Sequence, residues 1–336
     1  MRIGISLVDL AIGGAQTFLA QLAAGLDERG HHIYYYLFAS QDNPTYATPS
    51  LISTFNRHAE KVARPVDLHR CEAIQLDGYH SIWKKLPYLK VLDRCVETYQ
   101  SAYSIKRSGP FYLQHRVCSS RYIQGLFGRP ARLIYQGVPR LIGPLNSERS
   151  YDLAILGRIH PVKGHLLFLE ICERLFKAQG RLSAALIGGY PEMGPYQRLV
   201  QSKVAELINH GVEVCQTGDL AHSEVYDWLK QVKILLVTST DEGFGRMALE
   251  ALACETAVIA NPVGGLLEII QDGQTGLFAK RDDPQSFAQL TARILKDPAL
   301  RVQLARQGRE MVARHFSLDA MLDQYETLYQ QIAQGG

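Results

Sequence analysis

The stretch Thr238 to Glu250, TSTDEGFGRMALE, decides how the second half of this chain folds. It follows Lys233 to Val237, whose continuous apolar run predicts a strand buried on both faces. Gly243 and Gly245 predict a turn that can adopt positive φ, and Met247 to Cys254 predict a buried helix. A strand, a glycine turn and a helix in this order are typical of a parallel α/β sheet.

Two glutamates flank the expected start of this helix. Glu250 is the only charged residue of the helical run, and it lies roughly 7 Å beyond a helix start near Gly245, given the rise per residue of a helix. Glu242 stays in the turn. Carboxylates at this separation can hold two ends of an elongated ligand whose anionic middle rests on the helix N-terminus. A sugar, a diphosphate and a ribose fit this description, whereas an acidic turn with one incidental glutamate is the structural alternative.

Length and composition favour two domains in a cytosolic enzyme. The chain has 336 residues, it contains no run of about 18 apolar residues, and it opens on the strand-like MRIGISL, so we expect neither a membrane span nor a signal peptide. Six scattered cysteines without a CxxC pair predict reduced, packed thiols. Residues 1–148 carry 17 Lys and Arg against 11 Asp and Glu, a net charge of +6. This asymmetry favours an anionic membrane or phosphorylated lipid over nucleic acid as a partner, and a merely solvated basic surface is the alternative.

The first half reads as alternating strands and helices. Arg2 to Val8 predict a strand, and Gly13 and Gly14 open a helix, an arrangement that lets backbone approach a phosphate. The spacing is not GxGxxG, which disfavours an NAD-dependent enzyme. Further strands are predicted at His31 to Phe38, Ala73 to Leu76, Arg94 to Thr98, Val117 to Ser120 and Arg132 to Tyr135, with helices at Ser50 to Lys61 and Arg121 to Gly128.

The segment Trp83 to Lys90 interleaves aromatic, apolar and basic residues. That composition suits an interfacial segment that contacts anionic lipid headgroups. A short helix with one packed side would show the same pattern, and both interpretations stay open.

A cluster of glycines and prolines from Gly137 to Pro144 predicts a linker, and we place the domain boundary near residue 145. The second half restarts with a strand at Asp152 to Leu156. Arg158 and Lys163 follow at the carboxyl edge of the expected sheet, where ligands bind in doubly wound folds and where both cations can contact phosphate. Strands at Ser183 to Ile187, Val212 to Gln216 and Ala257 to Ile259, and helices at Pro284 to Lys296, Pro298 to His315 and Leu318 to Ala333, complete the chain.

These motifs together resemble the retaining glycosyltransferases of group 1, also called family 4, which have the GT-B fold. The resemblance rests on Gly157-Arg158 with Pro161 to Gly164, on Gln216 to Leu220, on Thr238 to Glu250, on Gly264-Gly265 with Glu268, and in the first half on Gly13 to Gln16 and Leu133 to Val138.

The resemblance implies two Rossmann-like, doubly wound parallel-sheet domains that face a central cleft. Residues 1–145 would form the acceptor-side domain and residues 146–317 the nucleotide-sugar domain, with helix 318–333 packing back on the first. The substrates would be a nucleotide-diphosphate sugar, uridine diphosphate being the usual nucleotide, and a glycan or lipid-linked acceptor. It implies neither a metal nor another cofactor. Retention is explained in this family by attack of the acceptor hydroxyl on the face that the diphosphate leaves, so no protein base is required.

Carried over by position, the resemblance implies roles for individual residues. Glu242, Arg158 and Lys163 would be catalytic, the two cations by holding the diphosphate. Glu250 would bind the ribose. The remaining donor contacts would come from Gly243, Phe244 and Gly245 at the sugar, from Gly13 and Gly14 at the phosphate, and from the turn Gly218 to Leu220 at the base.

The chain departs from the family pattern at the position of a first-domain histidine near the sugar. Gln100 stands there, and it is a candidate contact for the sugar or acceptor, with His80 and His115 as alternative matches. Glu255 and Ala257 stand where glycine and proline are usual, which predicts a changed turn.

Three functions follow as candidates. The first is a retaining hexosyltransferase in cell-surface polysaccharide or glycolipid synthesis, cytoplasmic or peripheral on the inner face of the membrane. The second is an epimerase or hydrolase of nucleotide sugars with the same fold, for which no sequence feature supplies an acid or base. The third is a non-catalytic GT-B partner subunit. Because Arg158, Lys163, Glu242 and Glu250 are all present, the transferase is favoured.

Overall fold

A computed structural model describes residues 1–10, 13–39, 48–78, 80–108, 113–140, 149–189 and 193–335. The chain divides into two compact units, residues 1–137 with 318–336 and residues 138–317. The first unit thus ends at Gly137, eight residues before the boundary predicted near residue 145, and that predicted boundary lies outside the described residues.

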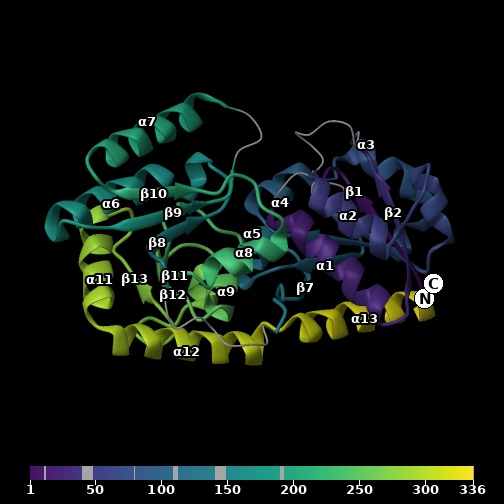
Figure 1. Ribbon diagram of the computed structural model, residues 1–336. Coiled ribbons are helices and arrows are strands. Elements are labelled where there is room, and N and C mark those ends of the chain that lie inside the picture. Colours follow the sequence, from purple (N-terminus) through teal and green to yellow (C-terminus); the bar gives the residue numbers. More distant parts are fainter. Residues whose placement is uncertain are drawn as a thin grey trace. The chain divides into compact units, whose positions relative to one another are not determined.

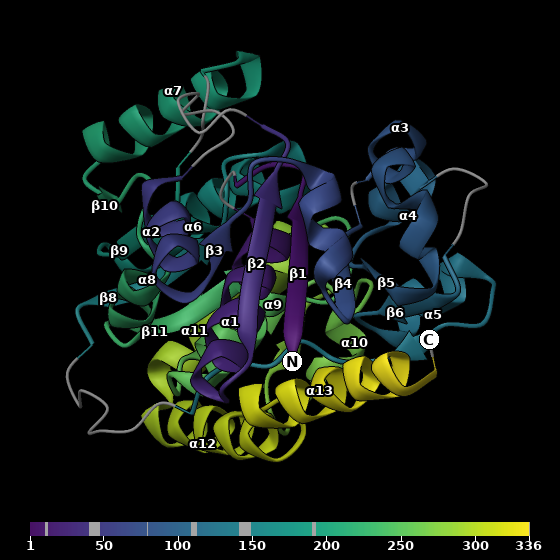
Figure 2. The same cartoon turned by 90° about the vertical axis from the view of Figure 1, so that its right-hand side faces the viewer.

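The first unit is built on a seven-stranded parallel sheet with the order β3-β2-β1-β4-β5-β6-β7. Figure 2 shows β2, β1, β4, β5 and β6 in this sequence across the unit. Its elements are β1 (Arg2–Leu7), α1 (Gly14–Glu28), β2 (His32–Leu37), α2 (Pro49–His58), β3 (Glu60–Lys61), η1 (Pro65–Arg70), β4 (Ala73–Asp77), α3 (Ile82–Lys85), η2 (Leu86–Arg94), β5 (Cys95–Tyr99), α4 (Ala102–Ser108), β6 (His115–Cys118), α5 (Arg121–Phe127), β7 (Arg132–Leu133) and α13 (Leu318–Gly335).

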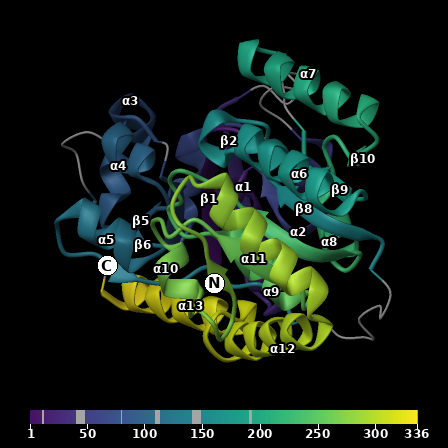
Figure 3. The same cartoon turned by 90° about the vertical axis from the view of Figure 1, so that its left-hand side faces the viewer.

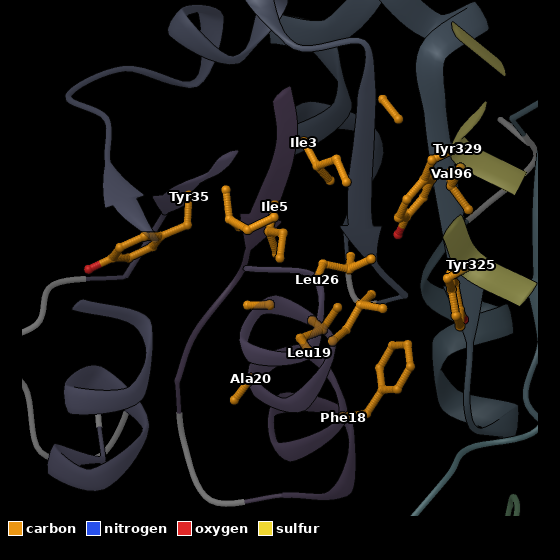
Figure 4. Packing of buried hydrophobic residues seen from close by; sticks show 14 of the residues in the cluster. Ile3, Ile5, Phe18, Leu19, Ala20, Leu26, Tyr35, Val96, Tyr325 and Tyr329 are labelled. Carbon is orange, nitrogen blue, oxygen red and sulfur yellow. The ribbon is translucent and has the colours of Figure 1, made fainter. Parts of the chain in front are cut away.

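Both faces of this parallel sheet are covered, as expected when strands alternate with helices along the chain. Ile3 and Ile5 point to the face covered by α1 and by the last helix of the chain, α13. In Figure 4, Tyr325 and Tyr329 of α13 lie against this core beside Val96 of β5. Hydrogen bonds fix α13 there: the Tyr329 hydroxyl donates to Gln75 Oε1 at 2.8 Å, and the Tyr325 and Thr98 hydroxyls lie 3.0 Å apart. The opposite face packs against η1 and η2.

The second unit has a six-stranded parallel sheet with the order β10-β9-β8-β11-β12-β13. Its elements, drawn in teal to yellow in Figure 1, are β8 (Tyr151–Leu156), η3 (Pro161–Lys163), α6 (His165–Gln179), β9 (Ser183–Ile187), α7 (Pro195–Asn209), β10 (Glu213–Gln216), α8 (His222–Leu229), β11 (Val232–Val237), α9 (Arg246–Ala253), β12 (Ala257–Ala260), α10 (Leu266–Ile269), β13 (Leu277–Phe278), α11 (Pro284–Lys296) and α12 (Pro298–His315). Helices α6 and α11 pack together over one face, as Figure 3 shows.

One prediction for the first unit needs correction. The helix predicted over Ser50 to Lys61 ends at His58, because Ala59 is extended and Glu60 and Lys61 pair with Tyr34 and Tyr35 as the edge strand β3. Pairing with β2 gives the backbone of these two residues hydrogen-bonding partners at the edge of the sheet.

In the segment Trp83 to Lys90, two side chains are buried, as the interpretation of a short helix with one packed side requires. Lys85 is buried, with Nζ 2.8 Å from Glu97 Oε1, and Tyr88 is buried with its hydroxyl donating to Ser6 Oγ at 2.7 Å. A buried cation requires such a partner, so these two side chains belong to the core. Trp83, by contrast, is 77% exposed.

Across the described ranges, no helix combines the length and the apolar character that crossing a membrane requires.

Candidate functional site

The candidate site lies where the order of the second sheet reverses direction. The chain runs from β8 outward through β9 and β10, then returns to β11 beside β8 and continues outward through β12. Ligands of doubly wound sheets bind outside the carboxyl ends of the strands at such a switch point. Here the carboxyl end of β8 leads into the loop that carries Arg158 and Lys163. The carboxyl end of β11 leads into the loop that carries Glu242.

Hydrogen bonds tie these two loops together. The Thr238 hydroxyl lies 3.0 Å from the carbonyl oxygens of both Lys163 and Gly164, and the Thr240 amide donates to the Val162 carbonyl at 2.9 Å. Gly164 adopts the left-handed region with φ 73°, and a Cβ placed there would overlap the Thr238 carbonyl. The close approach of the loops therefore depends on glycine at this position.

We expect Gly164→Ala to destabilise the second unit by about 2 kcal/mol more than Gly180→Ala does. Both glycines have φ 73°, but Gly180 has open space around its Cα, so it measures the cost of the left-handed backbone without a clash. Urea unfolding of both variants checks this difference. Equal losses of unfolding free energy in the two variants would show that the loops do not depend on glycine at position 164 for their close approach.

An ion pair joins the two loops at the switch point. Lys163 Nζ lies 2.8 Å from Glu242 Oε2, with side chains 24% and 13% exposed. Arg158 is exposed, and its guanidinium forms no ion pair with any residue in the described parts of the chain. The site thus holds two cations and one carboxylate, an arrangement that can bind an anion through Arg158 and Lys163 while Glu242 accepts hydrogen bonds from hydroxyl groups.

Glu250 is buried in α9 and has the partners that a lone carboxylate needs. Arg246 Nε and His222 Nε2 each lie 2.8 Å from Glu250 Oε1, whereas Oε2 takes no hydrogen bond from the described residues. Burial raises the pKa of the Glu250 carboxyl, but the Arg246 charge and the contacts with His222 outweigh it and lower the pKa below its usual value. The carboxylate is therefore ionised, and Oε2 is available to accept hydrogen bonds.

The glycine turn between Glu242 and α9 differs from the prediction at one position. Gly245 has φ 104°, but Gly243 does not adopt positive φ. Phe244 is buried, and its ring centroid lies 5.8 Å from that of Phe316. The Glu242 carbonyl accepts a hydrogen bond from the Gly265 amide at 2.9 Å. These contacts hold the turn, so positive φ is needed only where the chain enters the helix.

Between β10 and α8, Gly218 has φ 66° and is exposed, and Leu220 is half-buried.

The remaining predicted residues belong to the first unit. Gly13 is extended at φ −179° and precedes α1, which begins at Gly14. Gln100 follows β5, and its Oε1 accepts from Gln136 Nε2 at 2.7 Å. The two alternative histidines are occupied elsewhere: His80 is buried between Ser6 and Asp77, and His115 Nε2 lies 2.9 Å from the Asp93 carbonyl.

Two residues of the site escaped the sequence analysis. Arg246 stands four residues before Glu250, a helical spacing that brings opposite charges together and could have identified it. His222 is 28 residues away in sequence and on another helix, and no sequence pattern links it to Glu250.

His165 lies directly behind the Lys163 loop and predicts an acid-sensitive second unit. Burial and the nearby Lys163 charge lower the pKa of this buried imidazole to about 4. In the unfolded chain the His165 imidazole takes up a proton near pH 6.5, whereas in the folded chain it stays neutral until about pH 4. The free energy of unfolding that this residue contributes is therefore fully present above pH 6.5 and is lost as pH falls toward 4.

We expect His165→Gln to remove about 3 kcal/mol of this acid dependence, whereas exposed His210→Gln should leave it unchanged. Urea unfolding at pH 7, 5.5 and 4 checks the slope, and identical slopes for wild type and His165→Gln would contradict it.

Comparisons with known proteins bear on what this geometry does. The family model described as glycosyl transferases group 1 matches residues 143–311, which include Arg158, Lys163, Glu242 and Glu250. A D-inositol 3-phosphate glycosyltransferase of Catenulispora acidiphila is 29% identical over 194 residues, or 56% of this chain and 46% of that protein. A glycosyltransferase of Methanocaldococcus jannaschii is 27% identical over 222 residues, or 65% of this chain and 59% of that protein. The chain spans about half the length of these curated relatives.

Solved structures resemble the fold over nearly the whole chain. Anabaena HepE, solved in complex with UDP and glucose, superposes with a TM-score of 0.81 at 17% identity, covering 98% of this chain and 99% of that one. Sucrose-phosphate synthase of Thermosynechococcus elongatus superposes with a TM-score of 0.76 at 20% identity, covering 100% of both. At this level of identity the likeness concerns the fold, and it confirms the predicted class of two Rossmann-like units.

Proposed function

Because this chain belongs to the glycosyl transferases group 1 family and has the GT-B fold, we propose that it is a retaining glycosyltransferase that uses a nucleotide-diphosphate sugar. The observation that carries the proposal is the pairing of Lys163 with Glu242 at the switch point of the second sheet, beside exposed Arg158. Two cations and a hydrogen-bonding carboxylate suit a ligand that joins a diphosphate to a sugar.

The contacts of the site support a division of roles. Arg158 and Lys163 hold the diphosphate. When the diphosphate binds, Lys163 Nζ gives up part of its contact with Glu242 and contacts phosphate oxygens instead. Glu242 and the backbone of Gly243, Phe244 and Gly245 receive the sugar. Glu250 accepts from the ribose hydroxyls through Oε2, the oxygen not used by His222 and Arg246. The turn from Gly218 to Leu220 borders the base, and Gly13 and Gly14 approach a donor phosphate in this proposal.

The reaction follows from these roles. The acceptor oxygen forms a bond to the anomeric carbon on the face from which the diphosphate leaves. The bond between that carbon and the diphosphate oxygen breaks, and the diphosphate takes the acceptor proton. Arg158 and Lys163 stabilise the negative charge that develops on the leaving diphosphate, which is the main task of the protein in this step.

UDP is the proposed nucleotide, because the solved structure of HepE in complex with UDP and glucose shares this fold. The proposed acceptor is a hydroxyl of a glycan or lipid-linked glycan in polysaccharide or glycolipid synthesis. Exposed Trp83, Leu86 and Leu89, with Lys84 and Lys90 between and beside them, support peripheral contact with an anionic membrane at its cytoplasmic face.

Turnover assays test the function directly. We expect wild type to release UDP from UDP-glucose, UDP-galactose or UDP-N-acetylglucosamine when a bacterial lipid extract supplies acceptors, and mass spectrometry to detect a hexose-extended product. Equal turnover without any acceptor would indicate a hydrolase or epimerase instead. Nucleotide binding without turnover under any condition would indicate a non-catalytic subunit. Flotation with phosphatidylglycerol vesicles, compared between wild type and Trp83→Ala/Leu89→Ala, tests the membrane contact.

A further inference from the structure

The Glu250 carboxylate receives two hydrogen bonds on one oxygen. Arg246 Nε, from the preceding turn of the same helix α9, and His222 Nε2, from the start of α8, each lie 2.8 Å from Oε1. Oε2 takes no hydrogen bond from the described residues. A carboxylate that only had to be satisfied in the core could share two donors between its two oxygens. The uneven distribution therefore needs an explanation.

Arg246 alone supplies the charge that Glu250 needs, but it does not fix the carboxylate plane. The two residues are four apart on one helix, with side chains 9% and 7% exposed, so the opposite charge is already in place. The terminal torsion of a glutamate is broad, so a single donor leaves the carboxylate free to rock. A second donor that comes from another helix and meets the same oxygen selects one orientation. His222 thereby fixes where Oε2 lies.

The His222 ring is itself held in place. His222 is the first residue of α8, and its ring packs edge-on against Tyr226 of the same helix, with ring centroids 5.1 Å apart. Tyr226 is buried, and its carbonyl accepts a hydrogen bond at 3.7 Å from the thiol of Cys254, the residue after the end of α9. Helix α8 is thus tied to α9 at a second point, which makes His222 Nε2 a fixed donor to Glu250.

His222 also joins Glu250 to the turn that precedes α8. Leu220, the last residue of the turn from Gly218, stands two residues before His222. The His222 side chain is 25% exposed and the Glu250 side chain 7%, so their contact lies at the margin of the core. The contact connects the turn proposed to border the base with the carboxylate proposed to hold the ribose.

We propose that His222 is a positioning residue for nucleotide binding, which holds Glu250 so that Oε2 accepts from the ribose hydroxyls. The proposal rests on the proposed function, which supplies the nucleotide and assigns its ribose to Glu250. His222 does not contact the ribose and acts only through the carboxylate. A site built to pair with hydroxyl groups discriminates against a ligand that lacks them, so His222 raises the preference of the site for ribose.

Calorimetric titration with UDP and with 2′,3′-dideoxy-UDP tests this role. The variant His222→Phe keeps a ring beside Tyr226 and removes the donor. We expect its affinity for UDP to fall about 10-fold, as for a weakened hydrogen bond to a charged group. Its affinity for 2′,3′-dideoxy-UDP should stay within about 2-fold of wild type, because this ligand has no ribose hydroxyl for Oε2 to accept from. If wild type binds GDP or ADP instead, that nucleotide and its 2′,3′-dideoxy analogue replace the pair.

Two further variants separate the donated hydrogen bond from packing and folding. His222→Gln keeps a donor at about the position of Nε2, so its affinity for UDP should stay within about 3-fold of wild type. His210→Phe changes an exposed histidine of the same unit and should leave both affinities unchanged. Urea unfolding followed by fluorescence checks that each variant is folded at the temperature of the titration.

The ratio of the two affinities decides the outcome. Equal losses for UDP and the dideoxy nucleotide in folded His222→Phe would show that His222 contacts another part of the nucleotide or only supports the fold, and would overturn the proposal. Unchanged UDP affinity in His222→Phe, or a His222→Gln variant that loses as much as His222→Phe, would overturn it as well. Failure of the proposed function is distinct, because wild type would then bind no nucleotide, and the positioning role would fall with it.

Discussion

Replacing Lys163 by methionine is expected to lower kcat/KM for sugar transfer about 10³-fold, or about 4 kcal/mol of transition-state stabilisation. The ammonium group lies 2.8 Å from Glu242 at the carboxyl edge of the sheet, where the leaving diphosphate gains negative charge in the proposed reaction. Methionine keeps the length of the side chain and removes the charge. It also leaves Glu242 unpaired, so the remaining carboxylate repels the diphosphate.

Matched variants separate this effect from a general loss of charge. Lys177→Met removes an exposed lysine of the adjoining helix α6, 69% exposed and paired with Glu173, and should change kcat/KM less than 2-fold. Glu242→Gln removes the partner but keeps both cations, so its loss should be smaller than that of Lys163→Met. Steady-state release of UDP measures all three. A Lys163→Met protein that retains activity within about 3-fold of wild type would remove the lysine from the mechanism.

Arg149→Met is expected to destabilise the second unit by about 4 kcal/mol, the largest stability effect we predict for a single side chain. The Arg149 guanidinium is the donor in five hydrogen bonds of 2.6 to 3.2 Å, to the carbonyls of Leu229, Val232, Cys254 and Glu255 and to the Thr256 hydroxyl. These groups surround the start of β11 and the end of α9, the helix that carries Glu250. Methionine fills much of the space but removes all five of these hydrogen bonds, and of the five acceptors the Leu229 carbonyl still accepts from the Thr256 hydroxyl at 2.7 Å.

The two tryptophans of the chain allow the measurement to be assigned to one unit. Trp83 belongs to the first unit and Trp228 to the second, so in a Trp83→Phe background the fluorescence during urea unfolding reports the second unit. Arg149→Lys should recover less than half of the loss, because an ammonium has three donors and lacks the planar fork. Exposed Arg174→Met, which breaks an i,i+4 pair, should cost less than about 0.5 kcal/mol. An Arg149→Met loss below 1 kcal/mol would contradict the account.

The second unit was predictable from sequence because its strands are buried on both faces. Continuous apolar runs such as Ala184 to Ile187 mark such strands, and the helices Pro284–Lys296 and Pro298–His315 begin at prolines that fix their first turns. Once these strands and helices are recognised, the site residues can be named as well, because each lies at a fixed offset from a strand end or a helix start. They are Arg158, Lys163, Glu242 and Glu250.

The first unit was less predictable because its decisive contacts are distant in sequence. Lys85 and Tyr88 read as surface residues, and only Glu97 and Ser6, which lie elsewhere in the chain, make them core residues. The same holds for the hydrogen bond between Gln100 and Gln136. Pairing of Glu60 with Tyr34 likewise ends a helix that local propensity would have continued.

The central claim is that Glu250 and its neighbours bind a nucleotide, and calorimetric titration of UDP, GDP and ADP without divalent metal tests it most directly. We predict that wild type binds one of the three, and that Glu250→Gln, which keeps the shape of the side chain and removes the charge proposed to bind the ribose, weakens this binding at least about 30-fold. Glu206→Gln, an exposed control, should bind as wild type does. Absence of binding for all three nucleotides, or equal affinity in wild type and a folded Glu250→Gln, would contradict the account.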